Sequence, residues 1–118
     1  MKKKILIADD SKTFLLFEEL LLSELSCTIL KAYNGVEALQ KIQEEIPNLI
    51  LLDIHMPELS GVECCRMIKK NPAICKIPVI IVTAHGSEKE TCLKAGCNAI
   101  ITKPVDRKSL LETVKKYL

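Results

Sequence analysis

Residues 48–57 read Asn-Leu-Ile-Leu-Leu-Asp-Ile-His-Met-Pro, and this stretch determines how the rest of the chain is interpreted. The apolar run 49–52 lies between a Pro-Asn break and a proline-containing loop, which predicts a short strand buried on both faces. Asp53 follows at the end of that strand, where burying a carboxylate is costly unless neighbouring groups use it. Taken alone, Asp53 is explained as a turn residue, since aspartate is common in turns. A functional role therefore depends on partners elsewhere in the sequence.

Length and composition favour a single packed domain over residues 1–118. The chain has 118 residues, 48% of them hydrophobic, which suits one core and is too short for two. The formal net charge is +2 and the lysines are scattered without interleaved aromatic residues, so nothing indicates nucleic-acid binding. The apolar run 5–8 is too short for a signal peptide, and no segment is long enough to span a membrane. We therefore expect a cytoplasmic protein.

The cysteines are expected to be free thiols. A zinc site is disfavoured because no Cys-x-x-Cys pair occurs and neither histidine stands at a ligand spacing from a cysteine. Several cysteines fall on apolar faces, where the free thiol behaves as a small hydrophobe, and without a secretion signal we expect a reducing environment. The six positions are Cys27, Cys64, Cys65, Cys75, Cys92 and Cys97.

Short apolar runs alternate with segments of helical spacing along the whole chain. The apolar runs predict strands at 4–8, 28–32, 49–52, 79–82 and 98–102. The helical patterns and their end signals predict helices at 11–25, 34–46, 60–70, 87–96 and 106–118. Strands that alternate with helices through short connections indicate an α/β fold, with a parallel sheet covered by helices on both faces.

Several helix ends carry recognisable capping residues. Ser11 is placed to cap the first helix. The segments 34–37, 60–63 and 87–90 each repeat the capping-box spacing, in which an acidic residue follows the cap by three positions. Gly96 is placed to end the fourth helix in the left-handed conformation.

Polar residues follow four of the five predicted strands, at the edge where ligands bind in sheets of this kind. They are Asp9, Asp10, Asp53, Thr83 and Lys103. Converging carboxylates repel one another unless they share a cation, and a site with few oxygen donors suits a magnesium ion that also binds a phosphate. The lysine and the threonine hydroxyl would then contact phosphoryl oxygens around a carboxylate nucleophile, Asp53.

In these motifs the sequence resembles the response-regulator receiver family of bacterial two-component signalling. The motifs are Asp9-Asp10, Asp53-x-x-x-Pro57 with Gly61, Thr83-Ala84 and Lys103-Pro104, in order over the whole chain. The resemblance implies a (βα)5 flavodoxin-like receiver fold with strand order 2-1-3-4-5. It also implies a signalling switch, not an enzyme that turns over a substrate, in which Asp53 accepts a phosphoryl group from a histidine kinase or histidine phosphotransfer protein.

The resemblance further implies the roles of the site residues. Asp10 and Asp53 would bind Mg²⁺ directly, together with the backbone carbonyl of His55, and Asp9 would act largely through water. Thr83 and Lys103 would contact the phosphoryl oxygens. The Lys103-Pro104 bond is expected to be cis, although most X-Pro bonds are trans.

Partner surfaces are also implied by the resemblance. The first helix carries excess apolar surface around Phe14, Leu15 and Leu16, which is expected either to pack in the core or to dock a histidine-bearing helix. The output is expected through the fourth helix, fifth strand and fifth helix. One departure affects this output: the family usually carries Tyr or Phe three residues before the lysine, and here that position is Ile100, so we expect a muted switch.

Two other function classes share parts of this pattern. A haloacid-dehalogenase-like phosphatase also uses an aspartate nucleophile after a strand, but it requires a second aspartate two residues later, where this chain has His55. An FMN-binding flavodoxin-like module requires a phosphate loop after the first strand, where Asp9 and Asp10 would repel the phosphate. No Gly-x-Gly-x-x-Gly or Walker A motif occurs to support nucleotide binding.

Overall fold

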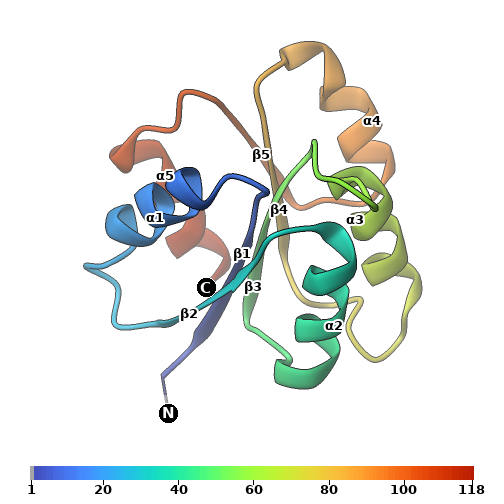
Figure 1. Ribbon diagram of the computed structural model, residues 1–118, viewed down its shortest axis with the longest axis horizontal. Helices are drawn as coiled ribbons and strands as arrows, with labels where there is room; N and C mark the ends of the chain where they lie inside the picture. Colours follow the sequence, from blue (N-terminus) through green and yellow to red (C-terminus); the bar gives the residue numbers. More distant parts are fainter. Residues whose placement is uncertain (1) are drawn as a thin grey trace.

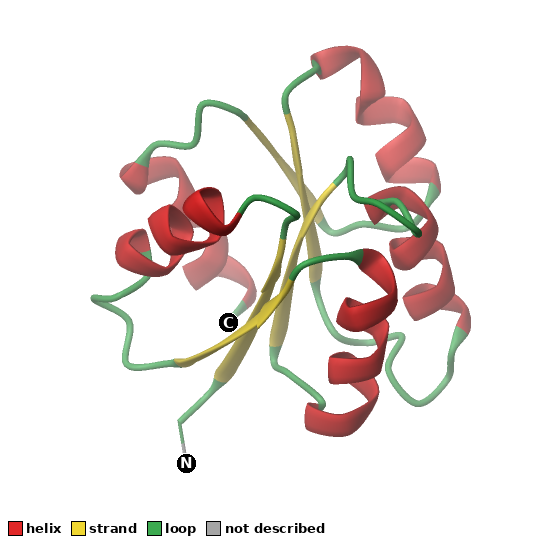
Figure 2. Ribbon diagram, in the orientation of Figure 1, coloured by secondary structure: helices red, strands yellow, loops and turns green. Residues whose placement is uncertain are grey.

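The computed structural model describes residues 2–118 as one central sheet with helices on both faces (Figures 1 and 2). The strands are β1 (Lys4–Ala8), β2 (Thr28–Ala32), β3 (Leu49–Asp53), β4 (Val79–Thr83) and β5 (Ala99–Thr102). The helices are α1 (Lys12–Leu21), α2 (Gly35–Glu45), α3 (Gly61–Lys70), the short 3₁₀ helix η1 (Gly86–Glu88), α4 (Lys89–Lys94) and α5 (Arg107–Tyr117). No helix among residues 2–118 is long and apolar enough to cross a membrane.

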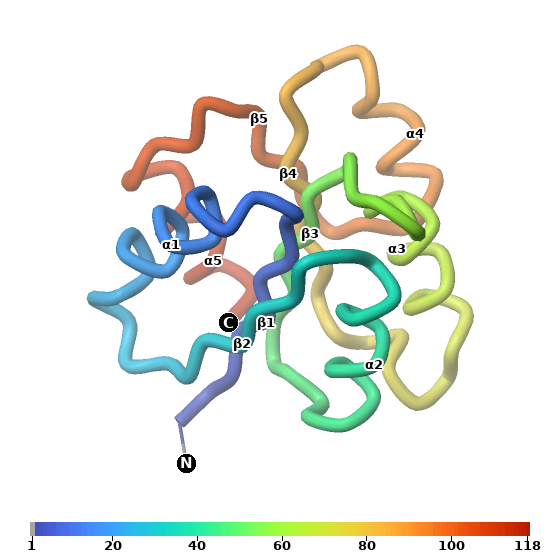
Figure 3. The backbone as a smooth tube through the Cα atoms, viewed as in Figure 1, coloured from blue at the N-terminus to red at the C-terminus, as the bar shows by residue number. Residues whose placement is uncertain are grey.

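The five strands are all parallel, in the order β2-β1-β3-β4-β5, which confirms the predicted fold class. Every residue of β3 and β4 is buried, as expected for central strands covered on both faces. Because the strands run in one direction, their carboxyl ends and the loops that follow them lie at one edge of the sheet (Figure 3). From β1 the chain connects outward to β2, and from β3 it connects outward in the other direction to β4 and β5, so the switch point of the strand order lies between β1 and β3. In doubly wound sheets, ligands bind at this switch point.

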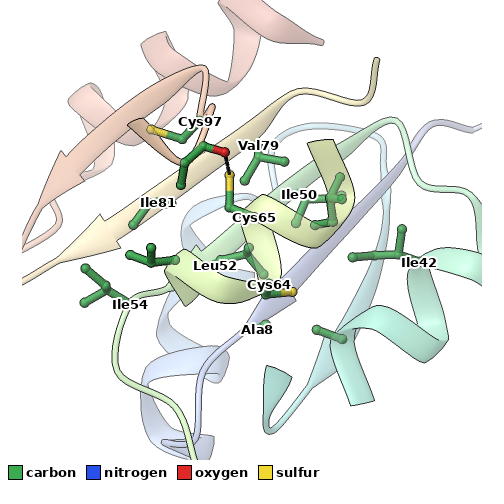
Figure 4. Packing of buried hydrophobic residues seen from close by; sticks show 14 of the residues in the cluster. Ala8, Ile42, Ile50, Leu52, Ile54, Cys64, Cys65, Val79, Ile81 and Cys97 are labelled. Carbon is green, nitrogen blue, oxygen red and sulfur yellow. Dashed lines mark hydrogen bonds between the residues drawn. The ribbon is translucent and has the colours of Figure 1, made fainter. Parts of the chain in front are cut away.

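Alternate residues of the central strands face two separate cores. Ile5 and Leu51 belong to the core that includes residues of α1 and α5, and Leu6 and Leu52 belong to the core that includes residues of α2, α3 and α4. Figure 4 shows part of the second core, where the thiol of Cys65 donates to the carbonyl of Ala95 at 3.6 Å.

The cysteines are free, as the sequence predicts. Burial raises the pKa of Cys64 and Cys65 to about 12, so these thiols stay protonated and pack as hydrophobes.

Three of the predicted helix starts carry a side-chain cap. The side chains of Ser11, Asn34 and Ser60 each accept a hydrogen bond from the backbone N–H three residues later. Ser60 also completes a capping box with Glu63. In α2 the carboxylate of Glu37 reaches the N–H of Tyr33 at 3.3 Å and not that of the cap residue, so the reciprocal bond predicted there is wrong.

The capping box predicted at Ser87 is wrong. Ser87 lies inside η1, and α4 begins at Lys89 without a side-chain cap. The acidic residue of that predicted box, Glu90, instead pairs with Lys94 on the helix surface at 3.2 Å. Gly96 does adopt the predicted left-handed conformation, with φ of 98°.

The first helix is shorter than predicted. It ends at Leu21 rather than near Leu25, because the Ser23 hydroxyl and amide both bond to the carbonyl of Leu20 and turn the chain. Leu15 is only 1% exposed, so of the two roles left open for it, core packing or docking, the structure supports core packing. The exposed apolar residues of α1 are Leu16, Phe17 and Leu20.

Candidate functional site

Three carboxylates meet at the carboxyl edge of the sheet. β1 leads into Asp9 and Asp10, and β3 ends in Asp53 on the neighbouring strand. One oxygen from each of the three groups lies within 4.8 Å of the others. Asp9 and Asp53 are 2% and 7% exposed, whereas Asp10 is exposed. The sequence predicted this convergence because parallel strands end at a common edge.

Lys103 places a positive charge against two of these acids. It follows β5, and its Nζ lies 3.2 Å from Asp53 Oδ1 and 3.6 Å from Asp9 Oδ2. The Lys103-Pro104 bond is cis, and the backbone N–H of Lys103 donates to the carbonyl of Thr83 at 2.8 Å. The ammonium group also sits 4.3 Å from the ring centroid of Phe14 on α1, a cation–π contact that helps fix its direction.

One lysine does not neutralise the buried acids. Burial, reinforced by the charge of Asp53 and opposed by the Ser11 N–H and Lys103, raises the pKa of Asp9 to about 6. Burial also raises the pKa of Asp53 above its ordinary value, against the lowering effect of Lys103. Burial alone would lower the pKa of Lys103, but the two carboxylates outweigh it and the pKa is raised.

The carboxylates fit a hard divalent cation. Among residues 2–118, no group donates a hydrogen bond to the buried Asp9 Oδ2, and its ion pair with Lys103 is 3.6 Å long, so a cation or a bound water would stabilise this oxygen further. All the grouped donors are carboxylate oxygens, the ligand type that suits Mg²⁺. A cation here would offset both the burial and the mutual repulsion that raise the pKa values of Asp9 and Asp53.

Gly61 lets the start of α3 pack directly against the backbone of Asp53 and Ile54. A Cβ atom at this glycine would lie 2.3 Å from the carbonyl oxygen of Asp53, so no larger residue fits without moving the backbone. The Gly61 N–H donates to the carbonyl of Ile54 at 2.9 Å and closes the loop. This close approach explains why the motif after Asp53 requires glycine at this spacing.

Thr83, at the end of β4, is fully buried and already has partners. Its hydroxyl donates to Glu88 Oε1 at 2.8 Å and accepts from the His85 N–H at 3.1 Å. The other oxygen of Glu88 pairs with His55 Nε2 at 3.1 Å. Sequence reasoning treated Glu88 only as part of a helix cap and missed this contact, because it depends on how η1 turns back over the strand end.

Glu18 on α1, a third buried acid besides Asp9 and Asp53, was also missed. It is 2% exposed, and burial, reinforced by the charges of Asp9 and Asp53 and opposed by Lys103, raises its pKa to about 8. A sequence signal did exist: Glu18 lies at helical spacing between the buried Leu15 and Leu22, on the stripe that faces the core.

Comparison with known proteins identifies the family to which this arrangement belongs. Residues 5–115 match the family model of the response regulator receiver domain. The chain belongs to this family. As a receiver domain it is a phospho-accepting switch of two-component signalling, and the family consists of signalling switches rather than classical enzymes.

Individual relatives of this receiver domain cover almost its full length. The polar-differentiation response regulator DivK of Brucella anthropi is 38% identical over 121 residues, spanning 100% of this chain and 98% of DivK. The crystal structure of a response regulator from Chloroflexus aurantiacus superposes with a TM-score of 0.95 at 29% identity, covering 99% of this chain and 98% of that one.

A third relative carries a metal ion. The receiver domain of a sensor histidine kinase from Pseudomonas aeruginosa has a magnesium ion coordinated in its active site cleft. It superposes with a TM-score of 0.91 at 25% identity, covering 99% of this chain and 98% of that one. None of these relationships supports the phosphatase or FMN-binding alternatives.

Proposed function

We propose that this receiver domain accepts its phosphoryl group on Asp53, from a histidine kinase or a histidine phosphotransfer protein. The observation that carries the proposal is the position of the Asp53 carboxylate, which lies 3.2 Å from Lys103 and within 4.8 Å of two further acids at the open edge of the sheet. A purely structural aspartate would not require this cluster of unneutralised acids around it.

The transfer is a displacement at phosphorus. An oxygen of Asp53 forms a bond to phosphorus as the bond from phosphorus to the donor's imidazole nitrogen breaks, and the electron pair of that bond stays on the nitrogen, which takes up a proton. Lys103 is placed to balance the added negative charge, and the Thr83 hydroxyl to donate to a phosphoryl oxygen.

Asp10 and Asp53 with the backbone carbonyl of His55 are the proposed direct ligands for Mg²⁺, and Asp9 a ligand through water. The donor chemistry of the site and the magnesium ion in the Pseudomonas aeruginosa relative support this assignment. When bound, Mg²⁺ would neutralise charge on the carboxylates and the phosphoryl oxygens. Asp9 Oδ2, to which no group among residues 2–118 donates a hydrogen bond, is the acceptor that a metal-bound water would satisfy.

The partner surfaces follow from exposure and from the family. Leu16, Phe17 and Leu20 form an exposed apolar strip on α1, which we propose as the docking surface for the histidine-bearing partner. The downstream target protein would bind the face formed by α4, β5 and α5. We propose that residues 1–118 act as one cytoplasmic receiver domain that promotes only its own phosphorylation and dephosphorylation, without binding nucleic acid or membrane.

The test is phosphorylation by acetyl phosphate with Mg²⁺, followed by mass spectrometry to locate the acyl phosphate. We expect wild-type protein to carry the label on Asp53 and the Asp53→Asn variant to carry none. Asp106→Asn is the matched control, because Asp106 is an exposed aspartate beyond β5 whose side chain makes no capping bond. Full labelling of Asp53→Asn would refute the assignment.

A further inference from the structure

The hydroxyl proton of Thr83 is already in use in the unphosphorylated chain. A hydroxyl has one proton to donate, and the shortest contact places it on Glu88 Oε1 at 2.8 Å, with the His85 carbonyl at a longer 3.3 Å. The acceptor is a carboxylate, which makes a stronger hydrogen bond than a neutral oxygen. A phosphoryl oxygen on Asp53 can therefore receive this hydrogen bond only if Glu88 gives it up.

The same carboxylate also connects two loops at the mouth of the site. Its Oε2 pairs with His55 Nε2 at 3.1 Å, joining the loop after β3 to the segment after β4. The Glu88 side chain is 26% exposed and that of His55 is 66% exposed, so the pair lies at the rim while Thr83 lies beneath it. Glu88 thus connects the loop that follows Asp53 with the end of the strand that carries Thr83.

We propose that Glu88 is a positioning residue that holds the Thr83 hydroxyl in the unphosphorylated state and competes for it with the phosphoryl group. This inference rests on the proposed role of Asp53. The competition is between two anions for one donor, so the negative charge of Glu88 opposes phosphorylation both by occupying the hydroxyl and by repulsion.

Release of Glu88 acts directly on α4. Glu88 is the last residue of η1 and immediately precedes α4, a helix of six residues that begins without a side-chain cap. Its contacts with Thr83 and His55 therefore fix the start of this helix. When the phosphoryl group takes the hydroxyl, η1 and the first turn of α4 lose that attachment, and the change reaches the proposed output face without an aromatic side chain at position 100.

The experiment measures binding of beryllofluoride, a phosphoryl mimic, with saturating Mg²⁺ by titration. Glu88→Gln keeps an acceptor oxygen but removes its charge, and we expect it to tighten binding roughly 3- to 10-fold, since a neutral acceptor competes less and a like charge is gone. Glu90→Gln is the matched control. Glu90 lies two residues after Glu88 and pairs with Lys94 on the helix surface, so this variant removes the same charge and should leave affinity unchanged.

Two further measurements separate this role from a general charge effect. In a Thr83→Ala background the gain from Glu88→Gln should largely disappear, because the contested donor is gone. Without ligand or metal, the amide resonances of residues 86–94 in Glu88→Gln should already be displaced toward their positions in mimic-bound wild type.

The outcomes distinguish this inference from the proposed function. If wild type binds the mimic but Glu88→Gln matches Glu90→Gln, or if the gain persists in full without Thr83, the competition is refuted and Asp53 remains the acceptor. Wild type that binds no mimic with Mg²⁺ overturns the role of Asp53 and this inference with it.

Discussion

Replacing Glu18 by glutamine should remove much of the pH dependence of stability of this receiver domain. Glu18 is 2% exposed beneath the site, and burial, with the charges of Asp9 and Asp53, raises its pKa from 4.5 to about 8. In the folded chain the carboxyl group therefore keeps its proton to about pH 8, whereas in the unfolded chain it loses the proton near pH 4.5. Between these values the native state binds the additional proton, so the free energy of unfolding falls as pH rises.

The pKa difference sets the size of this effect. Each pH unit inside the window costs at most about 1.4 kcal/mol, so raising the pH from 5.5 to 7.5 should lower the free energy of unfolding by up to about 3 kcal/mol through Glu18 alone. Asp9, with its pKa raised to about 6, adds a slope of the same sign up to that pH. Because Asp9 is present in both proteins, the difference between wild type and Glu18→Gln isolates the contribution of Glu18.

The assay is urea unfolding in metal-free buffer at half-unit steps from pH 5.5 to 7.5. Wild type should lose up to about 3 kcal/mol more than Glu18→Gln over this range. Glu19→Gln is the control, because Glu19 lies next to Glu18 on α1 but is partly exposed and pairs with Lys31 at 2.8 Å. Its curve should stay parallel to that of wild type. Parallel curves for wild type and Glu18→Gln would show that Glu18 is ionised in the folded protein and refute the reasoning.

Three further predictions concern the metal, the partner and the switch. Mg²⁺ at a hundred times its Kd should raise the free energy of unfolding by about 3 kcal/mol. Asp10→Asn should abolish that gain while stabilising the metal-free protein. Identical unfolding curves of wild type with and without Mg²⁺ would contradict a shared metal site. The double variant Leu16→Glu, Leu20→Glu should slow transfer from a cognate phosphodonor protein but spare labelling by acetyl phosphate. The control Met67→Glu, at an exposed position on α3, should affect neither. Equal transfer to wild type, the double variant and the control would exclude the α1 strip as the docking surface. Ile100→Tyr should enlarge the phosphate-dependent amide shifts in β5 and α4, and a wild type whose shifts are already as large would refute a muted switch.

Local sequence patterns were sufficient to predict the framework. The strand ranges 4–8 and 28–32 match the structure, because a short apolar-rich run bounded by polar or turn residues favours a strand. Asp53 and Thr83 each extend a predicted strand by one residue, since their backbone still pairs with the neighbouring strand. Parallel order then brings the strand ends together, so the acids and Lys103 meet as expected.

Features that depend on contacts between distant segments were not predictable in the same way. Leu15 and Leu16 are adjacent and equally apolar, and only the direction from which α1 meets the sheet decides that the first is buried and the second exposed. The segment after Thr83 has the local spacing of a capping box, but Glu88 bonds to Thr83 and His55 across the site instead. The His55–Glu88 pair joins residues 33 positions apart in the sequence, which no local pattern specifies.

Ile100 lies on β5, partly buried, next to the strand that carries Thr83. Ile100 pairs with Ile81 across the sheet and packs against the core that contains Cys92, inside α4, and Ala95, directly after it. A β-branched side chain with one preferred χ1 has little freedom to swing into space left by the Thr83 hydroxyl. A change in the packing around Ile100 would therefore be a consequence of a movement of α4 and not its cause. In this chain the sequence of events that the contacts favour begins with loss of the Thr83–Glu88 bond, continues with displacement of η1 and α4, and ends with adjustment of the core beneath them. The strength of the switch is then limited by the difference in phosphoryl affinity between two arrangements, one without and one with the Thr83–Glu88 hydrogen bond. Glu88 is the residue that sets this difference.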